Sequence, residues 1–324
     1  MPDPLPYSRE ADGNDGQTMK LLVQALAIVV LAAACAPQSP PTMRFIALGD
    51  APYGDPKEVD PPYRSLIQNI NQMAPPLVIH VGDTLGGVRC DNALIDKLRG
   101  FMDDFDAPLL YTPGDNEWTD CHRDNAGSFD PLERLSYLRS TYFQTGKTLG
   151  TDARTVETQS SQGYPENARL MMNNIGFITA HVVGSNNNFN PRDLDAVKEF
   201  MDRDRANIAW LNESFDAFAD AEAIVVALHA DMFVPTSGFQ NGWWASSPFR
   251  GIGVTLGKRS SALKKPVLLL YGDSHQHKAF QPFPEHRPYL HAIEVYGHPG
   301  IKAIEIAIRP DARTPFEVSK VLNP

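Results

Sequence analysis

The chain has 324 residues, a formal net charge of −10 and three cysteines. The acidic balance argues against nucleic acid as a partner, because phosphate backbones select basic surfaces. It does not exclude a small phosphorylated substrate, since bound metal cations can reverse the local electrostatic field.

The first 42 residues have the pattern of an export signal and a short tether. An apolar run over residues 21–34 follows Met19 and Lys20; it is too short for a membrane span and has the length of a signal-peptide core. The run ends at Cys35 and resembles a bacterial lipoprotein signal. This resemblance implies a lipid anchor on Cys35 as the only membrane contact, and export to the bacterial cell envelope, facing the periplasm or the outside.

Two other interpretations of this segment stay open. Alanine stands three places before Cys35, where lipoprotein signals usually have leucine, so simple cleavage after small residues or an uncleaved anchor are alternatives. Met19 is an alternative start, because the residues before it are acidic and polar. Residues 43–324 remain, enough for the single α/β domain that we expect there.

Three apolar runs, over residues 43–48, 77–81 and 108–112, predict buried strands. Helices predicted over residues 61–73 and 91–105 separate them. This alternation predicts βαβ units and a largely parallel sheet, whose ligands bind at the carboxyl ends of the strands.

Each of these three strands is followed by Gly-Asp, which places Asp50, Asp83 and Asp115 at the strand ends. A lone Gly-Asp is ordinary turn chemistry. Three at equivalent positions would gather three carboxylates, and a multivalent cation is the natural compensation for their repulsion.

The second half of the chain continues with a mixture of helices, strands and loops. The predicted elements are a helix over 130–142, a polar excursion over 144–167, a strand hairpin over 169–183 turned at Asn173 and Asn174, a helix over 191–219, a strand over 223–228, an irregular aromatic stretch over 233–258, a strand over 266–271, and a closing hairpin over 290–308. The aromatic stretch is interpreted as a packed loop, with a substrate wall as the alternative.

Histidines follow two of these later strands. His229 stands at the end of residues 223–228, and His275 and His277 lie two residues apart after Tyr271. Neutral imidazole is a good ligand for divalent metals of intermediate softness. His80 and His181 lie inside predicted strands, and we expect them to be structural.

In order, these blocks resemble the calcineurin-like metallophosphoesterase superfamily, whose blocks are Gly-Asp, Gly-Asp, Gly-Asn-His-(Glu/Asp), His and Gly-His-x-His. The resemblance spans residues 45–277. It implies an α/β fold, a four-layer αββα sandwich of two mixed β-sheets flanked by helices. It also implies hydrolysis of a phosphate ester or anhydride by a metal-bridging hydroxide.

The resemblance further implies two divalent or mixed-valence metal ions, of manganese, iron or zinc. Asp83 would bridge them. Asp50 and His277 would complete one site, and Asp115, His229 and His275 would complete the other.

Two positions depart from the family pattern. Pro52 replaces a histidine that many members have, and Tyr53 is the nearest substitute; a tyrosinate would favour a ferric-type metal. Asn116 replaces the histidine that protonates the leaving group; it could hydrogen-bond a phosphoryl oxygen, and His122 is a second candidate for the proton donor. Loss of the acid would favour phosphoanhydrides or aryl phosphates, whose leaving groups need little protonation.

Cys90 and Cys121 each lie a few residues beyond one of the carboxylates. In an exported protein we expect them to form a disulfide that ties two loops together, with two free thiols as the alternative.

Two alternative functions stay open. One is a catalytically degenerate metal-binding surface lipoprotein of the same fold. The other is a hydrolase that acts on something other than phosphate.

Overall fold

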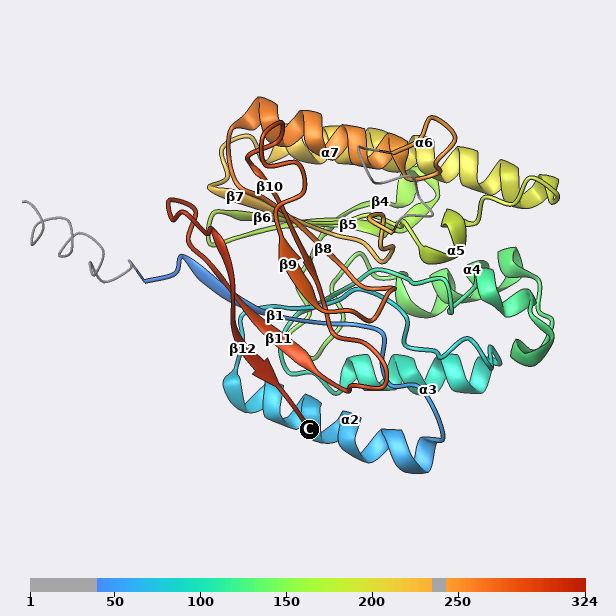
Figure 1. Ribbon diagram of the computed structural model, residues 1–324. Helices are drawn as coiled ribbons and strands as arrows, with labels where there is room; N and C mark the ends of the chain where they lie inside the picture. The colour runs from blue at the N-terminus through green and yellow to red at the C-terminus, as the bar shows by residue number, and fades with distance from the viewer. Residues whose placement is uncertain (1–39, 235–242) are drawn as a thin grey trace, which may run out of the picture. The chain divides into compact units, whose positions relative to one another are not determined.

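The computed structural model describes residues 40–234 and 243–324, and residues 41–324 form one compact unit. The export signal and Cys35 lie outside the described residues. Two mixed sheets pack face to face, with helices α2 and α3 covering the outer face of one and α6 and α7 covering the outer face of the other (Figure 1). The predicted αββα sandwich is confirmed. The helices are α2 (Pro56–Met73), α3 (Asn92–Asp103), α4 (Pro131–Tyr142), α5 (Gly184–Asn187), α6 (Leu194–Ala217) and α7 (Arg250–Leu263).

The first sheet has five strands in the order β12-β11-β1-β2-β3. Parallel pairing aligns Leu48 of β1 with His80 of β2, and His80 with Tyr111 of β3. The three predicted Gly-Asp pairs therefore follow matched positions at one edge of the sheet. Its strands are β1 (Met43–Leu48), β2 (Val78–His80), β3 (Leu109–Tyr111), β11 (Ala303–Ile308) and β12 (Phe316–Leu322).

The second sheet has seven strands in the order β4-β5-β6-β7-β8-β10-β9. Parallel pairing sets Ala227 of β7 beside Leu270 of β8, so the chain segments after both strands leave the sheet at the same edge. Its strands are β4 (Glu157–Gln159), β5 (Tyr164–Met172), β6 (Ile175–Thr179), β7 (Ala223–Ala227), β8 (Val267–Tyr271), β9 (Lys278–Phe280) and β10 (Leu290–Glu294).

Alternation along β1 shows how the layers form. Phe45 and Ala47 pack in the core between the two sheets, whereas Ile46 and Leu48 pack in the core beneath α2 and α3. Successive side chains of a strand point to opposite faces, so a strand covered on both sides is apolar throughout. Each large side chain buried in this way contributes roughly 1.5–3 kcal/mol to stability.

The closing hairpin was a wrong prediction. Strand β10 pairs in parallel with β8 in the seven-stranded sheet, whereas β11 pairs antiparallel with β1 in the five-stranded sheet. The turn between them therefore passes from one sheet to the other. An apolar run and its flanking glycines do not reveal which distant strand will be its neighbour.

Three further boundaries differ from the sequence prediction. Helix α7 occupies the end of the stretch predicted as irregular, the polar excursion contains β4 and the start of β5, and α2 begins before the expected residue 61. For α2 the signal was present: the Asp55 side chain caps the Lys57 N–H at 2.9 Å and Pro56 follows it. Among the described residues, no helix is long and apolar enough to cross a membrane.

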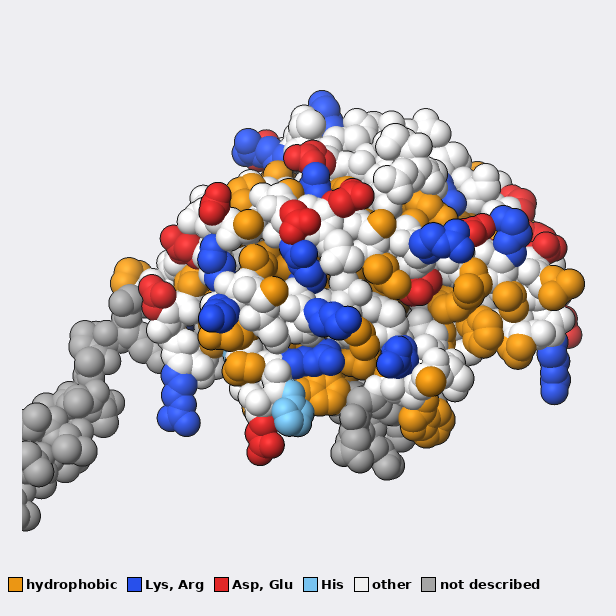
Figure 2. Space-filling view, turned by 90° about the horizontal axis from the view of Figure 1, so that it is seen from above, with side chains coloured by type: hydrophobic (Ala, Val, Ile, Leu, Met, Phe, Trp, Pro, Cys, Tyr) orange, Lys and Arg blue, Asp and Glu red, His pale blue; other side chains and the backbone are white. Residues whose placement is uncertain are grey.

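The face seen from above carries positive and negative side chains interspersed with apolar ones (Figure 2). Two apolar side chains of α6 are exposed, those of Leu194 and Met201. Scattered exposed apolar residues are normal in folded proteins and need no partner.

Candidate metal centre

Tight turns aim the carboxylates of the first sheet at one point. Asp50 and Asp83 adopt left-handed backbone conformations, with φ of 50° and 53°, directly after the glycines that end their strands. A Cβ on Gly114 would overlap the Asp83 side chain, so only glycine allows the two loops to approach this closely. The predicted gathering of Asp50, Asp83 and Asp115 is what the structure shows.

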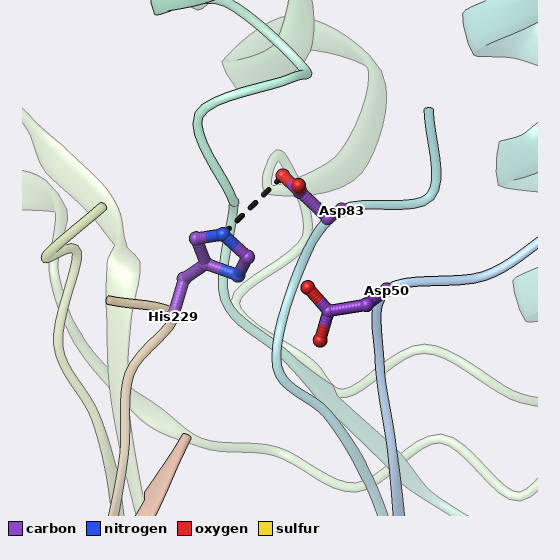
Figure 3. Close-up of side chains that lie close together, drawn as sticks. All are labelled: Asp50, Asp83 and His229. Carbon is purple, nitrogen blue, oxygen red and sulfur yellow. Dashed lines mark ion pairs between the residues drawn. The ribbon is translucent and has the colours of Figure 1, made fainter. Parts of the chain in front are cut away.

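His229 lies at the centre of two groups of potential metal ligands. The first group is Asp50, Asp83 and His229, whose side chains point toward one another (Figure 3), and the second is Asp115, His229 and Asp273; within each group the ligand atoms lie within 4.8 Å of one another. Nε2 of His229 lies 2.9 Å from Asp115 Oδ1 and 3.5 Å from Asp83 Oδ1.

The tautomer of His229 suits this position. Nδ1 lies 2.9 Å from the Val81 carbonyl oxygen, which can only accept a hydrogen bond, so Nδ1 carries the proton. Nε2 is then the nitrogen directed at the carboxylates, and it is the one that a metal ion could bind.

The structure departs from the prediction in its assignment of the last two histidines. His275 lies near Asp50, with its Nε2 3.6 Å from Asp50 Oδ1. His277 is turned away: its Nδ1 donates to the Glu294 carbonyl at 2.6 Å and its ring stacks on Tyr296 at 4.3 Å. Position 277 directly precedes β9, whose first residue Lys278 pairs with Glu294 of β10.

Asp273 is the residue that the sequence prediction missed. Its N–H donates to Asp50 Oδ1 at 2.9 Å, and its Oδ2 accepts from the Asp231 N–H at 2.9 Å. The signal was available, because Gly272-Asp273 is a fourth Gly-Asp at a strand end. If the Gly-His-x-His pattern of the resemblance is aligned from Gly272, Asp273 takes the place of its first histidine and His275 is its second.

Burial and crowding make this cluster electrostatically unfavourable without cations. Burial raises the pKa of Asp50 to about 8 and the pKa of Asp83 well above its usual range. Burial alone would lower the pKa of His229, but Asp83 and the neighbouring carboxylates outweigh it and raise that pKa. Oδ2 of Asp50 is buried and has no hydrogen-bond partner among the described residues. Such an oxygen fits a metal ligand.

Asn116 and Tyr53 both hold Asp83. The Asn116 amide donates to Asp83 Oδ2 at 2.6 Å and to the Leu85 carbonyl at 2.9 Å, and the Tyr53 hydroxyl donates to Asp83 Oδ2 at 2.9 Å. Burial, followed by the charge of Asp83, raises the pKa of Tyr53 well above its usual value. The phenol is therefore a neutral donor here, and Asn116 orients a carboxylate.

Glu117 is a second residue to which the sequence analysis assigned no role. Its buried carboxylate accepts from the Gly114 N–H at 2.8 Å, the Asp83 N–H at 3.1 Å and the Thr84 hydroxyl at 2.8 Å. It therefore joins the loops that follow β2 and β3. The third block of the family pattern ends in Glu or Asp, and this position could have identified Glu117 from the sequence.

His122 lies apart from both ligand groups. It is exposed, its Nδ1 donates to the Thr119 carbonyl at 2.6 Å, and it borders a cavity of about 410 Å³ together with Asp120. The predicted disulfide between Cys90 and Cys121 is confirmed. It joins the loops that follow β2 and β3, and both sulfurs lie 3.5 Å from the Asn116 carbonyl oxygen.

Comparison with known proteins finds similarity in structure alone. No protein-family model and no curated protein matches the sequence. A dimetal phosphatase from Danio rerio is 11% identical with a TM-score of 0.55, over 87% of this chain and 99% of that one. The anchor in the inner membrane complex of Plasmodium is 12% identical with a TM-score of 0.47, over 87% and 88%. A 5'-nucleotidase from Candida albicans is 11% identical with a TM-score of 0.43, over 87% and 51%. The chain has a divergent metallophosphoesterase-type fold.

Proposed function

We propose that the chain is a metal-dependent phosphoesterase that hydrolyses a phosphate ester or anhydride with two metal ions. The observation that carries the proposal is the convergence of four buried or half-buried carboxylates on one central imidazole, with a carboxylate oxygen left unpaired among the described residues. One ion would be held by Asp50, Asp83 and His275, and the other by Asp83, Asp115, His229 and Asp273.

The donor set favours hard metal ions. Four carboxylates and only two imidazoles surround the site, and oxygen ligands suit manganese and magnesium whereas imidazole suits zinc. Manganese is therefore favoured over zinc. Two such ions, when bound, would polarise a phosphoryl oxygen and lower the pKa of a coordinated water.

The chain's own residues position this chemistry and shape the choice of substrate. Asn116 and Tyr53 fix the orientation of Asp83, and a cavity of about 350 Å³ opens beside Asp273 and Ser185. An amide cannot protonate a leaving group, and His122 lies outside the cluster. Small phosphoanhydrides and aryl phosphates are therefore the favoured substrates.

The test combines metal content with turnover. We expect purified protein to bind about two Mn²⁺ per chain and to hydrolyse p-nitrophenyl phosphate or its bis-ester. Asp152→Asn, which removes an exposed carboxylate paired with Arg154, is the matched control and should behave as the parent. One ion or none, with no turnover in any divalent metal, would leave the degenerate binding protein as the better description.

Inorganic phosphate separates the remaining alternative. A phosphoesterase should bind its product at the metals, so phosphate should inhibit competitively. A hydrolase acting on another substrate class would turn over without that inhibition.

The export signal belongs to the same proposal. Lipidation at Cys35 would tether the domain to the cell envelope. Metabolic labelling with a radioactive fatty acid should mark the parent chain and leave Cys35→Ala unlabelled. Label on neither would favour simple cleavage.

A further inference from the structure

A turn of four left-handed residues, which includes most of the short element α5, lies against the second ligand group. Ser185, Asn186, Asn187 and Asn188 have φ of 45°, 59°, 54° and 60°. Asparagine is among the few non-glycine residues that enter this region readily, whereas four in succession are rare. Such a conformation persists only where the surrounding structure imposes it, and it is found preferentially at functional sites.

Arg203 of α6 holds this turn in place. Its side chain is fully buried and donates to Asn187 Oδ1 at 2.6 Å and to the Asn187 carbonyl at 3.0 Å. The same guanidinium pairs with Glu199 at 2.6 Å and donates to the His181 carbonyl at 2.9 Å. The turn is therefore fixed to the helix on one side and to the seven-stranded sheet on the other.

The turn presents one hydroxyl to the ligand group. Ser185 Oγ lies 2.7 Å from Asp115 Oδ2 and 2.7 Å from Asp120 Oδ1. Asp120 is also paired with Arg123 at 2.7 Å. The other oxygen of Asp115 faces His229 at 2.9 Å. Ser185 therefore contacts Oδ2 of Asp115, and His229 contacts Oδ1.

The backbone of the turn lies just as close. A Cβ on Gly184 would fall 2.8 Å from Asp115 Oδ1 and 2.6 Å from Asp273 Oδ1. The chain approaches both carboxylates with no side chain between, so a displacement of the turn would move the Ser185 hydroxyl and crowd the ligands together.

We propose that Ser185 is a positioning residue, which fixes the rotamer of Asp115 so that Oδ1 is directed at the metal pair. The inference rests on the proposed function and adds a residue that no part of the family pattern includes. Outer partners of metal ligands set ligand orientation, and their removal typically weakens metal binding 10- to 100-fold.

The test is Mn²⁺ binding by the full-length chain, measured by titration calorimetry. Ser185→Ala and Ser185→Gly should each weaken one of the two ions by about 10- to 100-fold and leave the other within a few-fold. Asn186→Ala is the matched control: it also places alanine at a positive φ, but Asn186 donates to the Phe189 carbonyl and not to a ligand.

The two variants separate positioning from folding. Glycine accepts a φ of 45° without strain, so Ser185→Gly stays folded even where Ser185→Ala does not. A parent chain that binds no Mn²⁺ would overturn the proposed function. A parent that binds two ions, with both Ser185 variants binding as Asn186→Ala does, would overturn the role of Ser185 alone.

Discussion

Asp83 is contacted by side chains from three other segments of the chain. Its carboxylate lies near His229 and accepts hydrogen bonds from Tyr53 and Asn116. Asp83→Asn should therefore lose both metals and reduce turnover by more than about 100-fold, since a ligand matters at least as much as its outer partners.

The same variant should stay folded. Burial raises the pKa of Asp83, which means that the buried charge is unfavourable in the metal-free protein, and a neutral amide removes it. Circular dichroism should show an unchanged or higher melting temperature without metal. Hydrolysis at the parental rate would mean that Asp83 binds no metal.

A substitution of Asp273 tests which metal ion the centre prefers. Asp273→His replaces a hard oxygen ligand by imidazole, so the ratio of Zn²⁺ to Mn²⁺ affinity should rise by about tenfold or more. Competition dialysis against both metals measures this ratio. An unchanged ratio would show that Asp273 does not bind the metal. Asp231→Asn is not a suitable control, because Asp231 forms an ion pair with Lys278.

Residues at this scale were predictable where the signal is local. A glycine and an aspartate directly after an apolar run specify a turn and a carboxylate, which is why Asp50, Asp83 and Asp115 could be found from the sequence. Which of His275 and His277 lies near the carboxylates depends on the pairing of β9 with β10 and on the Glu294 carbonyl. Neither contact can be recognised from the neighbouring sequence.

At the scale of elements, a buried ion pair joins α4 to β5. Glu166 is fully buried, pairs with Arg139 at 2.5 Å and accepts from His181 at 2.8 Å. Burial alone would raise the pKa of Glu166, but the hydrogen bond from His181 and the charge of Arg139 lower it to about 2. Burial lowers the pKa of His181, so the imidazole contributes a neutral N–H donor.

The sign of the pH dependence follows from this lowered pKa. The stabilisation is fully present above the usual carboxyl pKa of 4.5 and is lost as the pH falls toward 2. Glu166→Gln should cost about 3 kcal/mol of unfolding free energy at neutral pH and flatten the acid side of the stability profile.

Urea unfolding at several pH values measures this change. Glu157→Gln is the matched control, because that carboxylate also pairs with an arginine, Arg169 of β5, but is exposed, and exposed pairs contribute ~1 kcal/mol or less. Equal losses for the two variants would contradict a special contribution from the buried pair.

Helices that begin after a capping residue were predicted well, except for the start of α2, which Asp55 caps. Asp91, Asp130 and Asp193 each cap the helix that follows them, and those helices were found within a few residues. Helix α7 has no side-chain cap at Phe249, and it was missed. Sheet membership of β10 and β11 was missed because it depends on partners far away in sequence.

For the whole molecule, the direction of the strands decides at which edge of the sheet the carboxylates lie. The chain enters β1 at Met43 and reaches Asp50 beyond the opposite end, roughly 20 Å away for six strand residues. The start of β1 therefore lies at the edge of the sheet opposite to the carboxylates. The lining of the 350 Å³ cavity beside Asp273, which includes Phe249 and Ser274, comes from several loops at the ligand edge.

Substrate choice is the last property that follows from this assembly. Under the proposed function, Asn116 would stand where the family resemblance implies a proton donor, and its amide already donates to Asp83 and Leu85. General acid catalysis typically contributes 10²- to 10⁴-fold, so alkyl phosphates should react slower than aryl phosphates by at least about that factor. Rates for a series of aryl phosphates should fall steadily as the pKa of the leaving phenol rises. His122→Ala should leave this series unchanged; a shallow series that steepens in His122→Ala would make His122 the acid after all.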